Sequence, residues 1–120
     1  MVVSFKQMFL LQKEFQKLLT GKKLPIDSLE DYQYSMLHMM CEMGEVLKAD
    51  SRWKNNKGRE YNKKEKLTEI VDLLHFVINL ALFSGFDWDE VSAEFHRKNK
   101  INFSKVRLEK QKEDSIDNHS

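Results

Sequence analysis

The stretch from Leu67 to Phe83 constrains the fold of this chain more than any other. Most of its residues are aliphatic or aromatic, yet four polar side chains recur within it: Glu69, Asp72, His75 and Asn79. Steps of three, three and four residues place these side chains on one face of a helix. A helix that is apolar on its other faces is a buried helix, and a buried carboxylate is costly unless it is paired, hydrogen-bonded or bound to a metal. The stretch therefore predicts a core helix whose acidic side chains need a compensating positive charge.

Composition narrows the classes of protein that this chain can belong to. Its 120 residues are 41% hydrophobic and 32% charged, which fits one soluble globular domain. The formal net charge is only +1, so we expect no nucleic acid and no membrane as a partner. The N-terminus lacks the basic flank and long apolar run of a signal peptide, and the single cysteine, Cys41, suits a reducing compartment. We therefore expect a cytoplasmic protein.

Apolar periodicity and capping residues predict four helices and no strand, which is an all-α fold. The helices are expected over about residues 5–20, 28–50, 63–84 and 88–105, after capping boxes that begin at Ser4, Asp27, Asn62 and Asp87. The third helix is apolar nearly all round, so a lone four-helix bundle would not cover it and we expect a homo-oligomer. Residues 1–108 are predicted to form one domain, and residues 109–120 a polar, disordered tail.

Two pairs of carboxylates carry the predicted chemistry. Glu42 and Glu45 lie three residues apart on the second helix, and Glu69 and Asp72 repeat this spacing on the third. Sequential helices joined by a short loop pack antiparallel, so the two pairs can face each other. Four neighbouring carboxylates repel one another unless cations bind them, and an all-oxygen site selects hard ions such as Mg²⁺ or Mn²⁺. A solvated acidic face that forms salt bridges with lysines is the structural alternative.

Other polar residues have both a functional and a structural interpretation. The segment 51–61 is basic with interleaved aromatic residues, so it can bind phosphates and stack on a base, or be an ordinary solvated loop. Gln12 and Asn102 sit on apolar stripes, where an amide needs a partner in the core or on a nucleobase. His75 follows Asp72 by three residues, as in the carboxylate-x-x-His unit of di-iron bundles. A core histidine bonded to the backbone or a side chain is the favoured interpretation, and a contact with a ligand is a further one.

The order and spacing of the acidic motifs resemble a known family. Glu-x-x-Glu, a step of 24 residues from Glu45 to Glu69, and then Glu-x-x-Asp look like the all-α NTP pyrophosphohydrolases. This is the MazG-like superfamily, which includes the dimeric dUTPases, and the similarity covers about residues 5–107. It implies a four-helix MazG-like bundle that uses Mg²⁺ to hydrolyse a nucleoside triphosphate to the monophosphate and pyrophosphate.

Further segments look most like the dimeric dUTPase branch. They are Gln12, Trp53-Lys54, residues 72–76 and residues 98–102. The chain departs from that branch at Phe15, where an Asn is frequent, and the arginine expected after Asn102 is either Lys105 or Arg107.

The resemblance implies a role for each candidate residue. The metal ligands would be Glu42, Glu45, Glu69 and Asp72. Glu45 would also orient or deprotonate the attacking water. The phosphate-binding residues would be Arg52, Lys54, Lys98 and Lys105. The base and the sugar would contact Gln12, Trp53, His75 and Asn102.

The leading hypothesis is hydrolysis of dUTP to dUMP and pyrophosphate by a Mg²⁺-dependent homodimer or homotetramer. One alternative keeps this chemistry and changes the base, to dCTP, a modified dNTP or NTPs broadly. A second alternative is a non-catalytic helical interaction module whose acidic pairs are surface. A di-iron bundle is the third, but it needs the carboxylate-x-x-His unit twice and this chain has it once.

Overall fold

The computed structural model of this chain describes residues 1–21, 28–54 and 60–119. These residues form four α-helices and one short 3₁₀ helix: α1 (Phe5–Thr20), α2 (Leu29–Ala49), η1 (Ser51–Lys54), α3 (Lys63–Phe83) and α4 (Trp88–His119). There is no strand in the described ranges, so the predicted all-α class is confirmed. No single described helix is long and apolar enough to cross a membrane. Among the described residues, α3 and α4 meet that criterion only when they are counted together as one bent pair, by length and composition.

Capping residues explain where the helices begin and end. Ser4 forms the predicted capping box at the start of α1, and the Asn62 side chain accepts two backbone hydrogen bonds at the start of α3. Asp27, the predicted cap of α2, lies outside the described residues, and Ser28 caps this helix instead. Gly21 ends α1 with a φ of 65°, a left-handed conformation that costs other residues more.

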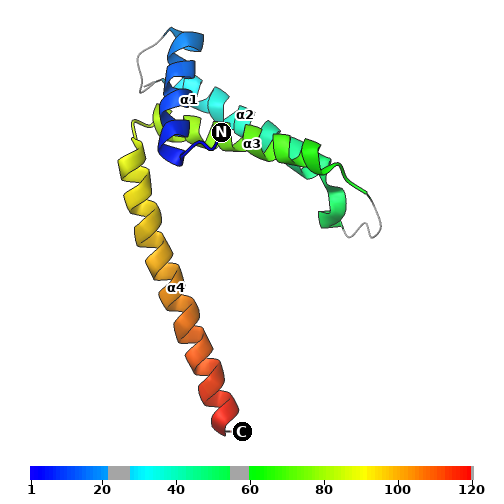
Figure 1. The fold of residues 1–120 in the computed structure, drawn as a ribbon, viewed down its shortest axis with the longest axis vertical. Helices are drawn as coiled ribbons and strands as arrows, with labels where there is room; N and C mark the ends of the chain where they lie inside the picture. The colour runs from blue at the N-terminus through cyan, green and yellow to red at the C-terminus, as the bar shows by residue number, and fades with distance from the viewer. Residues whose placement is uncertain (22–27, 55–59, 120) are drawn as a thin grey trace. The chain divides into compact units, whose positions relative to one another are not determined.

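The chain divides into two compact units, and the first of them, Met1–Asp87, is built on α3. Both α2 and α1 pack against α3, and Figure 1 shows α2 and α3 side by side along most of their lengths. The small buried core joins Phe9 of α1 to Ile78 and Leu82 of α3. Leu67 and Val77 of α3 remain 62% and 48% exposed. α1 and α2 thus cover only part of α3, which agrees with the expectation that one chain alone does not bury this helix completely.

The second compact unit begins at Trp88 and is α4 itself. This helix has 32 residues and continues to His119, well beyond the predicted end near residue 105 and through most of the predicted disordered tail. The extra turns are rich in Lys, Glu and Gln, which favour helix even without an apolar stripe. Lys110 and Glu113 form an ion pair of 3.9 Å on consecutive turns there. The domain boundary at residue 108 stays a prediction.

Candidate functional site

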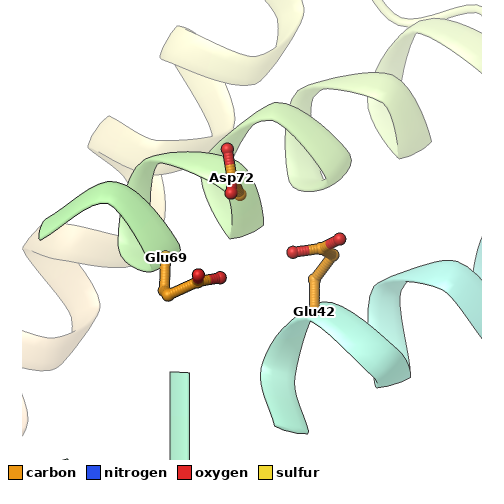
Figure 2. Close-up of side chains that lie close together, drawn as sticks. All are labelled: Glu42, Glu69 and Asp72. Carbon is orange, nitrogen blue, oxygen red and sulfur yellow. The ribbon is translucent and has the colours of Figure 1, made fainter. Parts of the chain in front are cut away.

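Carboxylates from α2 and α3 converge in what we call the carboxylate cluster, Glu42, Glu69 and Asp72. One oxygen from each of these side chains lies within 4.8 Å of the others, and Figure 2 shows them directed toward a common space between the two helices. All three are half-buried. The structure therefore brings together three of the four predicted metal ligands. Glu45 is exposed and lies outside this group.

The electrostatics of the carboxylate cluster are unfavourable without a cation. Burial raises the pKa of Glu69, and the negative charges of Asp72, Glu45 and Glu42 raise it further. No described lysine or arginine forms an ion pair with the cluster. A set of carboxylate oxygens that lacks a basic partner fits a hard divalent cation such as Mg²⁺ or Mn²⁺. Glu45 is near enough to act on Glu69 through its charge.

A cavity of about 710 Å³ lies among α1, α2 and α3. This volume is in the range typical of small-molecule pockets. Its lining combines amides with aromatic rings, among them Gln12, Gln16, Tyr34, His38, Phe76 and Asn79. Two of the rings, His38 and Phe76, lie parallel with centroids 5.7 Å apart. Flat apolar walls and a few polar groups suit a planar, polar ligand.

The cavity and the carboxylate cluster lie on the same two helices. On α2, His38 lines the cavity and Glu42 follows one turn later. On α3, Asp72 and Asn79 are seven residues apart, a rise of about 10 Å along the helix axis. A ligand with a planar ring at one end and anionic groups at the other could therefore occupy both places at once.

Polar contacts inside the cavity link α1 to α3. Gln12 Nε2 donates a hydrogen bond of 2.8 Å to Asn79 Oδ1, and Asn79 is 6% exposed. Asn79 thus holds the side chain of Gln12 in place from the polar face of α3. His75 also lines the cavity, but it is exposed. The favoured interpretation of His75 as a core histidine is therefore wrong, because this face of α3 opens into the cavity.

Trp53 lies in a different place from the other predicted base-binding residues. Its indole Nε1 donates to the carbonyl of Leu47 at 3.0 Å, which holds the ring at the end of α2. Trp53, Lys54 and Gly44 border a second hollow of about 450 Å³. Gly44 precedes Glu45 in α2, so this hollow adjoins the acidic motif. The structure groups Gln12 with His75 and groups Trp53 with Lys54.

Arg52 belongs to a separate cluster, the Asp50 clasp, formed by Asp50, Arg52 and Lys66. The Arg52 guanidinium donates to both oxygens of Asp50, with 2.7 Å from Nη2 to Oδ2, and Lys66 Nζ lies 2.8 Å from the same oxygen. The hydrogen bonds from Arg52 and Lys66 hold the pKa of Asp50 well below its usual range. The Tyr61 ring lies 4.0 Å below the guanidinium carbon of Arg52. The clasp ties the end of α2 to the first turns of α3.

The remaining predicted residues lie on α4, in the second unit. Lys98, Asn102 and Lys105 are all exposed there, and their part in the site stays a prediction. One cavity residue, Gln16, was not singled out from the sequence. It follows Gln12 by four residues, so helical periodicity places both on one face of α1 and could have identified it.

Comparison with known proteins gives a single clear relationship. A dUTPase family matches residues 4–85, which is more than half of the chain and includes both acidic motifs and the cavity. No curated protein and no solved structure matches the chain. The match supports a nucleotide hydrolase of the dUTP pyrophosphohydrolase type. With its helical fold and its paired acidic motifs, this chain belongs to the all-α dUTPase family, which is related to the MazG-like proteins.

Proposed function

We propose that this chain is a Mg²⁺-dependent pyrophosphohydrolase that converts dUTP to dUMP and pyrophosphate. The observation that carries the proposal is the convergence of Glu42, Glu69 and Asp72 within 4.8 Å, inside the segment that the dUTPase family matches. No described lysine or arginine forms an ion pair with these three side chains, so their arrangement suits a site that a cation completes.

The residues present fit Mg²⁺, with Mn²⁺ as a substitute. The carboxylate cluster would hold the ion through oxygen atoms, and Glu45 would join it directly or through a water. Bound there, the ion would lower the pKa of a water and neutralise phosphate oxygens. In this proposal Glu45 orients or deprotonates the attacking water, because it is the exposed carboxylate beside the cluster.

The phosphates of the substrate would lie between the carboxylate cluster and basic side chains. Lys54 borders the hollow next to the acidic motif of α2, and it is the best placed of the candidates in the first unit. Lys98 and Lys105 of α4 are assigned the same role. Arg52 is assigned a smaller part, because its guanidinium is already bound by Asp50.

The base and the sugar would occupy the cavity among α1, α2 and α3. Gln12 and His75 line this cavity. The helices α2 and α3, which form two of its walls, also carry the carboxylate cluster. Trp53 would contact the nucleotide from the second hollow, and Asn102 from α4. A nucleotide has this form, with a planar base at one end and phosphates at the other.

We also propose that the protein is a homodimer or homotetramer that acts in the cytoplasm. Apolar side chains in both halves of α3 remain exposed in one chain, as Leu67 and Val77 illustrate. A second copy that packs on α3 would bury them. Light scattering coupled to size-exclusion chromatography should give a mass of two or four chains, and a monomer at micromolar concentration would contradict this part of the proposal.

The activity is tested with a panel of dUTP, dCTP, dTTP and UTP, with pyrophosphate detected in the presence and absence of Mg²⁺. We expect release of pyrophosphate from dUTP with Mg²⁺ and none after the metal is removed with a chelator. Faster turnover of dCTP would change the substrate and keep the chemistry. Absence of pyrophosphate from every nucleotide would refute the proposal.

A further inference from the structure

The lysines and arginines of this chain are unevenly distributed along it. Residues 97–112, in the middle of α4, contain seven of the 20 lysines and arginines but only one of the 19 acidic residues, Glu109. The formal net charge of +1, on which the expectation of no nucleic-acid partner is based, averages over this difference, because the rest of the chain is net negative. The match to the dUTPase family ends at residue 85 and does not include this segment. The positive charge of α4 therefore needs an explanation of its own.

Most of this positive charge is not compensated by carboxylates of the chain. The described ion pairs on α4 join Arg97 to Glu94 and Lys110 to Glu113. The other five basic side chains of the segment form no ion pair with a described residue; they are Lys98, Lys100, Lys105, Arg107 and Lys112. All five are exposed. Their charges are therefore accessible to an anionic partner.

Helical geometry arranges these five side chains in two rows along α4, which Figure 1 shows as one continuous helix. Lys98, Lys105 and Lys112 follow one another at steps of seven residues, and Lys100 and Arg107 repeat this step. Seven residues are nearly two turns, so each row runs along the helix, and the two rows lie about 150° apart around it. The strip between them carries short or uncharged side chains: Ile101, Ser104, Leu108 and Gln111. We call the two rows and this strip the basic face.

We propose that the basic face lies in the major groove of duplex DNA and binds the phosphates on both sides of the groove, without selecting a base sequence. An α-helix with its side chains is about 10–12 Å in diameter, and the major groove is about 12 Å wide. Two basic rows on opposite flanks of the helix would then each meet one phosphate backbone. Contacts from lysine and arginine to phosphates supply affinity but carry no sequence information. This inference does not rest on the proposed function, which shares only Lys98 and Lys105 with the basic face.

A membrane surface and duplex RNA fit the basic face less well. A helix that lies on a membrane needs a broad apolar face, and the strip between the basic rows has only Ile101 and Leu108. The opposite side of α4 combines Phe95 and Val106 with the polar Asn102. The major groove of duplex RNA is too deep and narrow for side chains to enter. Duplex DNA is therefore the partner that the basic face fits best.

The test is the double substitution Lys100→Gln with Lys112→Gln in the full chain, which removes one charge from each row. The matched control is Lys6→Gln with Lys13→Gln, which removes two exposed lysines of α1 and the same net charge. Glutamine favours helix nearly as well as lysine, so circular dichroism should show the same helix content in the wild type and both variants. Neither Lys100 nor Lys112 is assigned to the nucleotide site, so hydrolysis of dUTP should also be unchanged.

Binding is measured by fluorescence anisotropy with a labelled DNA duplex over a series of salt concentrations. For the wild type, the logarithm of the association constant should fall linearly with the logarithm of the salt concentration, with a slope of about −4 to −5 for five phosphate contacts. In the double variant of α4 the slope should be shallower by about two, and Kd at low salt should rise at least about tenfold. The control variant should bind as the wild type does, and two duplexes of different sequence should bind equally well.

Three results would overturn the inference. The first is that the wild type does not bind duplex DNA at low salt. The second is an equal loss of affinity in both double variants, which would show a general effect of net charge rather than a role of the basic face. The third is tighter binding to duplex RNA or to phosphatidylserine vesicles than to duplex DNA. None of these results bears on the proposed function, which is tested by release of pyrophosphate.

Discussion

The Asp50 clasp and the carboxylate cluster both join α2 to α3, yet their charges are handled in opposite ways. In the clasp, Asp50 is 8% exposed at its side chain and is bound by two cationic side chains, so its pKa is lowered. In the carboxylate cluster, burial and the negative charges of neighbouring carboxylates raise the pKa of Glu69. A charge that is compensated within the chain stabilises the fold, whereas an uncompensated one lowers stability until a ligand arrives. The first cluster is thus suited to structure, and the second to binding.

The largest effect is expected from removing a charge of the carboxylate cluster. Asp72→Asn and Glu69→Gln should each lower kcat for dUTP by at least about a thousandfold, because several kcal/mol of metal-derived stabilisation of the transition state would be lost. Without Mg²⁺, both variants should unfold at the same temperature as the wild type or higher, since like charges are removed. Steady-state kinetics and thermal unfolding give the two quantities.

Glu14→Gln is the control for these variants. Glu14 is an exposed carboxylate of α1 outside the cluster, so its loss should change neither kcat nor Tm appreciably. If Asp72→Asn retained wild-type activity, the cluster would be an acidic surface, as the interaction-module alternative requires.

Mg²⁺ should distinguish the two clusters by its effect on stability. A cation that binds only the folded state at a hundred times its Kd adds about 2.7 kcal/mol to the free energy of unfolding. The wild type should therefore gain several degrees in Tm with Mg²⁺, and Glu69→Gln should gain little. Asp50→Asn should keep the full shift, because the clasp takes no part in metal binding. Equal shifts in the wild type and Glu69→Gln would contradict this assignment.

Removing the anion of the clasp should lower stability and leave the chemistry intact. Asp50→Asn leaves Arg52 and Lys66 close together without their counter-charge, so Tm should fall at pH 7. The folded-state pKa of Asp50 lies below its unfolded value of about 3.9. Its contribution to stability is therefore complete above that value and is lost as the pH falls below it. The difference in Tm between wild type and variant should narrow from pH 7 to pH 3, and a constant difference would argue against the clasp.

Helical periodicity and antiparallel packing predicted that acidic side chains of α2 and α3 lie close together, but they did not predict the cavity. Residues three apart share a helix face, so Glu69 and Asp72 were certain to be neighbours once the helix formed. Glu45 has the same spacing from Glu42 but is exposed, so periodicity alone does not decide which carboxylates join the cluster. The contact of Gln12 with Asn79 spans 67 residues of sequence, and it depends on how α1 packs across α3.

Long-range packing also decides which apolar side chains of α3 stay exposed in one chain. The pattern of α3 shows that its faces are apolar, but it cannot show which of them α1 and α2 cover. Leu67, between Lys66 and Thr68, is 62% exposed, and Val77 is 48% exposed although it lies in the more apolar half of the helix. The continuation of α4 to His119 depends on helix propensity rather than burial, so the absence of an apolar stripe did not indicate it.

The smallest effect on activity is expected from Arg52, a candidate phosphate-binding residue that belongs to the Asp50 clasp. If its guanidinium bound phosphate freely, Arg52→Gln would raise KM for dUTP strongly. Its bonds to both oxygens of Asp50 instead predict a rise of less than about threefold, the scale of an exposed ion pair, with a fall in Tm. Because Arg52 and Asp50 act on each other, the double variant should lose less Tm than the sum of the single losses. Additive losses in Tm together with a large rise in KM would show that Arg52 binds the substrate and that Arg52 and Asp50 contribute to stability independently.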